Sequence, residues 1–199
     1  MTDLPRLATD RLLLRPFVAA DAPTVERLAG APEVADTTLT VPHPYPPGAA
    51  EAWIAEHTPA WAADRRLTLA VCVADAPDVV VGAIGLGIAA AHARAELGYW
   101  IGVDAWGRGY ATEAARAIVA FGFATLGLNR IQAQHFLRNP ASGRVLQKVG
   151  MTFEGVHRQM YRRWGRFEDA AMYAALAADW PPPEHDRVAA APTFTPPLP

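Results

Sequence analysis

The chain has 199 residues, of which 51% are hydrophobic, and its formal net charge is −2 with a sequence pI of about 6.3. This length and composition are typical of one globular domain with a full hydrophobic core, and they argue against a disordered chain. The mildly negative charge argues against nucleic acid as a partner, because neutralising its phosphates requires a basic face.

Cysteine content and hydropathy narrow the cellular context. Cys72 is the one cysteine, so no intrachain disulfide forms, and no cysteine or histidine spacing resembles a zinc site. The N-terminal residues 1–5 lack a basic segment followed by an apolar core, and no stretch approaches the ~20 apolar residues of a membrane span. We therefore expect a cytoplasmic protein that binds neither a metal nor a membrane.

Hydrophobic periodicity and turn residues predict a single α/β domain over residues 1–180. In chain order, the expected elements are a strand at 9–17, a helix at 21–30, a loop or broken helix at 31–48, a helix at 48–64 interrupted at Pro59, strands at 67–74, 79–87 and 95–103, a helix after Gly109, a strand at 129–137, a helix at 139–149, and strands at 151–156 and 170–176. Residues 181–199 are rich in proline and alanine, which predicts a flexible tail.

Some of these elements carry clear boundary signals. Asp21 is placed to cap the helix that reaches about Gly30, and Asn139 is placed to cap the helix that Gly150 ends. In contrast, five prolines exclude a long regular element from residues 31–48. A segment of this kind forms either a lid or wall of a substrate site or a connection that only wraps the surface.

The stretch 95–113 changes from an alternating strand into a glycine turn and then into a helix. Glu96 is the only acid in its strand. The glycine turn at residues 107–109 would leave backbone N–H groups unpaired at the positive end of the helix dipole. This arrangement suits a phosphorylated ligand.

A second glycine pattern, Gly85-Leu86-Gly87-Ile88-Ala89-Ala90, matches the GxGxxA form of a dinucleotide fingerprint. A nicotinamide-dependent oxidoreductase would need a crossover helix at residues 89–97 and an acid on the next strand, whereas Asp104 falls in a turn. The alternative, which we favour, is that these glycines end a strand at a bulge or tight turn.

The run Trp106-Gly107-Arg108-Gly109-Tyr110-Ala111 resembles motif A of the GNAT N-acetyltransferases, with Gly109 and Ala111 at the small positions and Trp106 in place of the usual Gln or Arg. Further segments resemble the Rim-type branch, which acetylates ribosomal-protein N-termini: residues 9–16, 97–101, 110–114, 128–130, 139–142, 148–151 and 154–155. The resemblance covers about residues 8–178. It implies the GNAT acyltransferase fold, an α/β (α+β) fold with a mostly antiparallel mixed sheet, two splayed strands and flanking helices.

The resemblance also implies that acetyl-CoA lies where the strands 95–103 and 129–137 splay apart. Ile101 and Val103 would pair their backbones with the amides of its pantetheine arm, and Asn139 would contact the same arm. Its pyrophosphate would lie on the glycine turn and the helix start, on Gly107, Arg108, Gly109, Tyr110, Ala111 and Thr112.

Transfer of an acetyl group to an amine requires a base, an oxyanion donor and an acid for the departing thiolate. Glu96 is the candidate base, directly or through a water, because it is the one carboxylate in the strand beside the cofactor. Ser142 would lie near the thioester sulfur and is the candidate acid, and a backbone N–H near Ile101 is the candidate oxyanion donor. Some Rim-type relatives carry a glutamate base in the segment that here reads 159–162, so Tyr161 is a candidate substitute proton donor.

Each of these residues also has a structural interpretation. Glu96 fits an exposed strand carboxylate, Arg108 a solvated turn residue, and Asn139 and Ser142 ordinary helix-start residues. His135 and Cys72 are expected to be structural. Three tryptophans have two interpretations, as core or rim residues or as the walls of an amine pocket: Trp100, Trp106 and Trp164.

Together these features predict an acetyl-CoA-dependent N-acetyltransferase that works by direct transfer in a ternary complex without a metal. The expected acceptor is a protein N-terminal amine of the ribosomal-protein type. The alternatives are a small amine such as a polyamine, drug or metabolite, and a catalytically silent acyl-CoA-binding module. A homodimer is left open.

Overall fold

The computed structural model describes residues 3–180, so the predicted tail at 181–199 lies outside it. The elements in chain order are β1 (Leu7–Ala8), β2 (Leu12–Arg15), η1 (Ala19–Asp21), α1 (Ala22–Ala29), α2 (Pro32–Asp36), α3 (Ala49–Ala55), α4 (His57–Ala62), β3 (Arg66–Val73), β4 (Ala76–Ala89), η2 (Ala90–His92), β5 (Arg94–Ile101), η3 (Val103–Ala105), α5 (Tyr110–Ala124), β6 (Arg130–Phe136), α6 (Pro140–Val149), β7 (Thr152–Arg163), β8 (Arg166–Leu176) and η4 (Ala177–Asp179). None of the helices in this part of the chain is long and apolar enough to cross a membrane.

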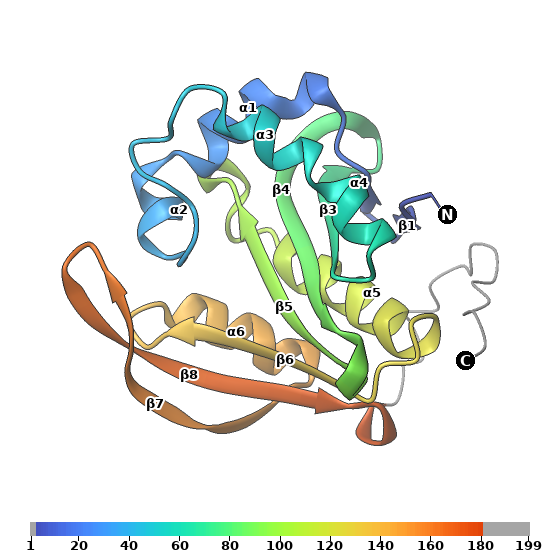
Figure 1. Cartoon of the computed structure of the whole chain (residues 1–199), viewed down its shortest axis with the longest axis vertical. Coiled ribbons are helices and arrows are strands. Elements are labelled where there is room, and N and C mark those ends of the chain that lie inside the picture. The colour runs from blue at the N-terminus through green and yellow to red at the C-terminus, as the bar shows by residue number, and fades with distance from the viewer. Residues whose placement is uncertain (1–2, 181–199) are drawn as a thin grey trace.

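The described strands form one eight-stranded sheet with the order β1-β2-β3-β4-β5-β6-β8-β7. Neighbouring strands are antiparallel except for β5 and β6, which run parallel. The predicted mixed α/β fold with a mostly antiparallel sheet is therefore confirmed. Figure 1 shows β4 and β5 in the middle of the molecule and the long β7–β8 hairpin curving toward α2.

The parallel pairing of β5 with β6 is short. Leu97 and Ala133 are its last partners, and beyond them β5 pairs only with β4, while β6 pairs only with β8. The two strands therefore separate, as the resemblance implied. The backbone edge of residues 98–101 is left without a strand partner on that side.

The helices α5 and α6 cover one face of the sheet (Figure 1). Ala114, Ala115 and Ile118 of α5 are fully buried there, and the small alanines let the helix approach the strands closely. On the opposite face a smaller core lies under α1 and α3, where Val25 packs with Cys72. Cys72 is buried, as expected.

Some boundaries in the first half were predicted wrongly. The expected strand at 9–17 is shorter in the structure, where β2 covers only Leu12–Arg15, and a separate two-residue strand, β1, precedes it at Leu7–Ala8. Asp21 precedes α1 but makes no capping hydrogen bond, because its carboxylate instead accepts hydrogen bonds from both Nη atoms of Arg15, at 2.8 and 2.9 Å, and from the Val18 N–H at 2.8 Å. Burial would raise the pKa of Asp21, but these hydrogen bonds outweigh it and the pKa is lowered.

The break between α3 and α4 falls at Glu56, three residues before the Pro59 that was expected to cause it. Pro59 lies in the first turn of α4, where its missing N–H costs no helical hydrogen bond. The proline-rich segment 31–48 holds the short helix α2 and is otherwise irregular, as predicted.

The strand expected at 95–103 ends early, at Ile101. The Gly102 N–H still donates to the Val81 carbonyl at 2.9 Å, but Val103–Ala105 forms a 3₁₀ turn. Val103 therefore offers no strand edge to a ligand. In the second half, β7 and β8 extend well beyond the predicted strands and meet at the predicted turn near Trp164 and Gly165.

The dinucleotide interpretation of residues 85–90 is wrong. These residues continue β4 into the three-residue turn η2, and β5 then returns antiparallel to β4. A Rossmann unit needs a crossover helix and a parallel strand at this point. The glycines therefore belong to the β4–β5 hairpin. They lie inside β4 and pair regularly with β5, so the favoured alternative of a strand end with a bulge or tight turn at these glycines is also corrected.

Candidate active site

A cavity of about 1010 Å³ runs through the opening between β5 and β6. At one end it is lined by the glycine turn before α5 and by the start of α6. At the other end it is lined by residues 37–42 and by Tyr161 of the β7–β8 hairpin. Most of the predicted site residues therefore line one continuous space.

The glycine turn presents backbone donors to this cavity. Gly107 and Gly109 have φ values of +74° and +81°, a conformation that glycine adopts without strain. The Glu113 N–H donates to the Gly109 carbonyl, so the N–H groups of the first three residues of α5 have no acceptor within the helix. A Cβ on Gly107 would meet no protein atom within 4 Å, which leaves the space beside the turn open. The turn thus fits the phosphates of a nucleotide-type ligand.

Glu113 in the first turn of α5 fixes this site to the start of the chain. Its carboxylate accepts hydrogen bonds from Thr9 Oγ1 at 2.6 Å, from the Arg11 N–H at 2.9 Å and from Arg11 Nε at 2.7 Å. Burial would raise the pKa of Glu113, but these hydrogen bonds outweigh it and lower the pKa. Arg11 also donates to the Arg108 carbonyl at 3.1 Å, so the segments 9–16 and 110–114 hold the turn in place together.

The open edge of β5 carries the backbone groups that face the splay. Because the Gly102 N–H bonds to β4, alternation directs the N–H and C=O groups of Tyr99 and Ile101 away from β4, into the opening. Trp106 Nε1 donates to the Ile101 carbonyl at 2.6 Å, which leaves the Ile101 N–H for another partner. Trp106, the tryptophan of the motif, thus occupies one backbone acceptor of the open β5 edge.

The start of α6 brings a hydroxyl pair to the same opening. Asn139 caps the helix by accepting from the Ser142 N–H at 3.3 Å, as the sequence predicted. Ser142 Oγ lies 2.7 Å from the Tyr99 hydroxyl, and either oxygen is able to donate. Burial raises the pKa of Tyr99 to about 12, so this phenol stays protonated at neutral pH. The sequence did not single out Tyr99, although its place beside Ser142 follows from the strand alternation and the separation of β5 from β6.

Glu96 and Tyr161, predicted separately as candidate catalytic residues, are joined by Gln134 of β6. Gln134 Nε2 donates to Glu96 Oε1 at 2.8 Å and to the Tyr161 hydroxyl at 2.5 Å. Because the Tyr161 oxygen accepts from Gln134, its own proton is free to point elsewhere. Gln134 had no signal in the sequence, since β5, β6 and β7 meet only in the folded sheet.

The wall around the far end of the cavity joins distant segments. Arg163 of the hairpin donates to the carbonyls of Ala35 at 2.8 Å, Leu39 at 3.1 Å and Val41 at 2.5 Å. These carbonyls border the stretch 37–42 that lines the cavity. The segment 31–48 therefore lines the cavity and does more than wrap the surface, as the first of its two alternatives predicted.

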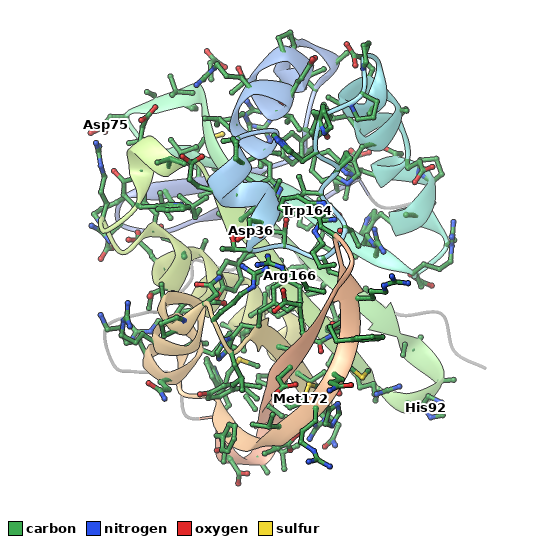
Figure 2. The ribbon with its side chains drawn as sticks, turned by 90° about the vertical axis from the view of Figure 1, so that its left-hand side faces the viewer. Asp36, Asp75, His92, Trp164, Arg166 and Met172 are labelled. Carbon is green, nitrogen blue, oxygen red and sulfur yellow. The ribbon has the colours of Figure 1, made fainter. Side chains whose placement is uncertain are left out.

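An ionic network supports the same junction. Asp36 of α2 accepts from Arg138 at 2.6 Å and lies 3.3 Å from Arg166, and Glu168 accepts from Arg138 Nε at 3.0 Å. Figure 2 shows Asp36 and Arg166 with Trp164 where the hairpin meets α2. Trp164 also lies 5.9 Å, ring to ring, from His43.

The structure does not bring all of the predicted residues into the cavity. Val103 and Arg108 are absent from its lining, as is Trp164, whereas Trp100 and Trp106 are present. His135 lines it, packs on Tyr173 and has its Nε2 buried without a partner in the described part of the chain. Within residues 3–180, no group of three or more His, Cys, Asp or Glu side chains is arranged to hold a metal ion.

Comparison with known proteins decides the family, since residues 11–152 match the family model described as "Acetyltransferase (GNAT) domain". The chain belongs to the GNAT family. Over 98 residues, which are 49% of this chain, it is 41% identical to the uncharacterised N-acetyltransferase YoaA of Bacillus subtilis. This match spans only 55% of YoaA, about half of that relative's length.

Solved GNAT structures share the fold. The ribosomal-protein-S5-alanine acetyltransferase from Vibrio fischeri superposes with a TM-score of 0.77 at 18% identity, over 89% of this chain and 100% of that one. A chimera of spermidine N-acetyltransferase SpeG from Vibrio cholerae with hSSAT has a TM-score of 0.71 at 19% identity, over 84% of this chain and 96% of its own. At these identities the likeness establishes the fold alone. Enzymes named for a ribosomal protein and for spermidine both have this fold.

Proposed function

We propose that the protein is an acetyl-CoA-dependent N-acetyltransferase whose acceptor is a protein N-terminal amine. The observation that carries the donor assignment is the continuous cavity with a glycine turn at one end and a splayed strand edge in its middle. The unpaired N–H groups of α5 suit the pyrophosphate, and the Ile101 N–H is placed for the pantetheine arm or for the developing oxyanion.

Each step of the transfer has a candidate residue at the opening. Glu96 takes a proton from the acceptor amine, directly or through a water, and Gln134 holds its carboxylate in position. Ser142 gives its hydroxyl proton to the departing thiolate, and the Tyr99 hydroxyl in contact with it is able to replace that proton. Tyr161, which Gln134 links to Glu96, is a second proton donor.

The charge of the cavity supports an N-terminal amine over a polyamine. Among the described residues that line it, Glu96 is the only carboxylate, while Arg66, Arg144 and Lys148 are basic. A polyamine carries several ammonium groups, and burying them beside one carboxylate would leave most of them unpaired. A peptide with one α-ammonium group matches the single acid.

A competition assay tests this proposal. Purified protein, acetyl-CoA, a short peptide with a free N-terminus and spermidine are mixed in equal amounts, and mass spectrometry identifies the acetylated product. An N-acetylated copy of the peptide serves as the control acceptor. We expect acetyl transfer to the free peptide and CoA release that depends on it. Preferential acetylation of spermidine would overturn the acceptor assignment, and acetyl-CoA binding without transfer to any amine would favour the silent module.

A further inference from the structure

A row of three residues crosses the acceptor side of the sheet from β3 to β5. Arg66 is the strand partner of Gly87, and Gly87 is the strand partner of Glu96. Directly opposed residues project from the same face, so the side chains of Arg66 and Glu96 leave the same face with a glycine between them. Their Cα atoms are about 10 Å apart, because neighbouring strands lie about 4.8 Å apart.

The space between these two side chains is open. A Cβ on Gly87 would have the Glu96 carbonyl at 3.9 Å as its nearest neighbour, and a Cβ on Gly98 would meet nothing within 4 Å. Arg66, Gly87, Glu96 and Gly98 all line the cavity. The floor between the arginine and the glutamate thus has room for part of a ligand.

The two ends of this floor carry opposite charges that do not neutralise each other. Within residues 3–180, the side chain of Arg66 makes no ion pair or hydrogen bond, whereas the side chains of Arg11, Arg15, Arg130, Arg138 and Arg166 are all paired with carboxylates. Thr68, two residues along the same strand, is 7% exposed and also lines the cavity. β3 therefore contributes a guanidinium and a hydroxyl, both hydrogen-bond donors, opposite the carboxylate of β5.

We propose that Arg66, assisted by Thr68, binds an anionic group of the acceptor while the acceptor amine lies at Glu96. The inference rests on the proposed function and names its substrate class: an amine that carries a carboxylate a few ångströms away. For an N-terminal peptide, that carboxylate is the side chain of Asp or Glu at the second position. A polyamine is disfavoured, because its second ammonium group would meet the arginine.

Kinetics with three peptides that differ only at the second residue test the proposal. The peptides carry Glu, Gln or Lys there, and the assays run at pH 7.5. We expect kcat/KM to be about tenfold higher for the Glu peptide than for the Gln peptide, chiefly through KM, and lowest for the Lys peptide. Arg66→Gln should abolish the preference, and Arg66→Glu should reverse it in favour of Lys. The KM for acetyl-CoA should stay unchanged in both variants.

Arg65→Gln is the matched control, because Arg65 is the exposed neighbour of Arg66 and does not line the cavity. It should keep the wild-type preference. Equal kcat/KM for the three peptides in the wild-type protein, or an equal loss of preference in the two arginine variants, would overturn the proposal.

A second pair of acceptors separates this proposal from the proposed function. γ-Aminobutyrate carries an amine and a carboxylate, and butylamine carries the amine alone. If no peptide is acetylated but γ-aminobutyrate is preferred to butylamine in an Arg66-dependent way, the anion subsite stands and the peptide assignment fails. If butylamine or spermidine is the better acceptor, the subsite is wrong.

Discussion

The two ends of the cavity are built in different ways. The donor end, where we propose that acetyl-CoA binds, consists of three short segments. The glycine turn and the start of α5 present backbone N–H groups, and the start of α6 presents the Ser142 hydroxyl. The acceptor end consists of residues 37–42, the β7–β8 hairpin and the row from Arg66 to Glu96, which come from distant parts of the chain. Side-chain contacts such as those of Arg163 hold this end together.

This difference explains why the donor is easier to identify than the acceptor. A backbone site depends on glycine conformation and helix position, which leave local signals in the sequence. A site made of side chains on several strands depends on sheet register, which has no local signal. GNAT enzymes with the same fold but different acceptors, such as the S5-alanine and spermidine enzymes, are consistent with this division.

The largest effect is expected at the point where the two ends meet. Glu96→Gln removes a proton acceptor with little change of shape, so kcat should fall by about 10²- to 10³-fold. The acetyl-CoA affinity should not change. Steady-state kinetics provide the measurement, with Glu26→Gln, at an exposed carboxylate of α1, as the control. An unchanged kcat would remove Glu96 from the mechanism.

The donor end is tested by two glycines with similar backbones. Gly107 and Gly127 have φ values of +74° and +64°, and a Cβ on either meets no protein atom within 4 Å. Replacement by alanine should therefore cost each a similar stability, about 1 to 2 kcal/mol. Only Gly107→Ala should weaken acetyl-CoA binding, by about tenfold, because its Cβ enters the phosphate site. Isothermal titration measures this, and equal affinities in the two variants would contradict the placement of the cofactor.

The acceptor end is tested at Arg163. Arg163→Ala removes the donors that hold the carbonyls of residues 35–41, so hydrogen exchange at 37–42 should speed up and the acceptor KM should rise about tenfold. The acetyl-CoA KM should stay constant. Arg162→Ala is the control, since Arg162 is exposed and contacts Phe167 instead. An equal rise of both KM values would show that the two ends are not independent.

The effect that is smallest near neutral pH concerns acid stability. His57 packs against Trp53, a residue of the cavity wall, with 4.4 Å between the ring centres. Burial, and to a lesser degree the positive charge of Arg66, lowers the pKa of His57 from an ordinary 6.5 to about 4. Below pH 6.5, His57 becomes protonated in the unfolded chain but stays neutral in the folded chain. The free energy of unfolding should therefore fall by up to about 3 kcal/mol as the pH drops from 6.5 toward 4.

His57→Phe should remove this part of the pH dependence, which urea unfolding at pH 7 and pH 5 measures. In the wild-type protein, hydrogen exchange should rise first in α3 and α4, before α5, because His57 belongs to α4 and packs on Trp53 of α3. Identical pH slopes in the two proteins would contradict the role of His57.

Much of the donor end could be predicted from the sequence. The glycine turn, the cap at Asn139 and the end of α6 at Gly150 follow from local conformational rules, and the structure has all three. Even there the prediction placed Val103 in the strand, because apolar alternation continues past Ile101 while the chain has already turned.

Most of the acceptor end could not be predicted from local sequence patterns. Residues 157–169 are mostly exposed on both faces of the hairpin, so they show no alternation to mark the strands, and a bulge near Gln159, where φ is +52°, shifts the register. The link from Glu96 through Gln134 to Tyr161 joins three strands, and its existence depends on that register.

A peptide that holds both a free N-terminal α-amine and a lysine tests the proposed acceptor most directly. The purified protein is incubated with this peptide and acetyl-CoA, and fragmentation mass spectrometry locates the acetyl group. We predict a single acetyl group on the α-amine, formed in step with CoA release. Acetylation of the lysine alone, or no transfer while acetyl-CoA binds, would contradict the proposed transfer to an N-terminal amine.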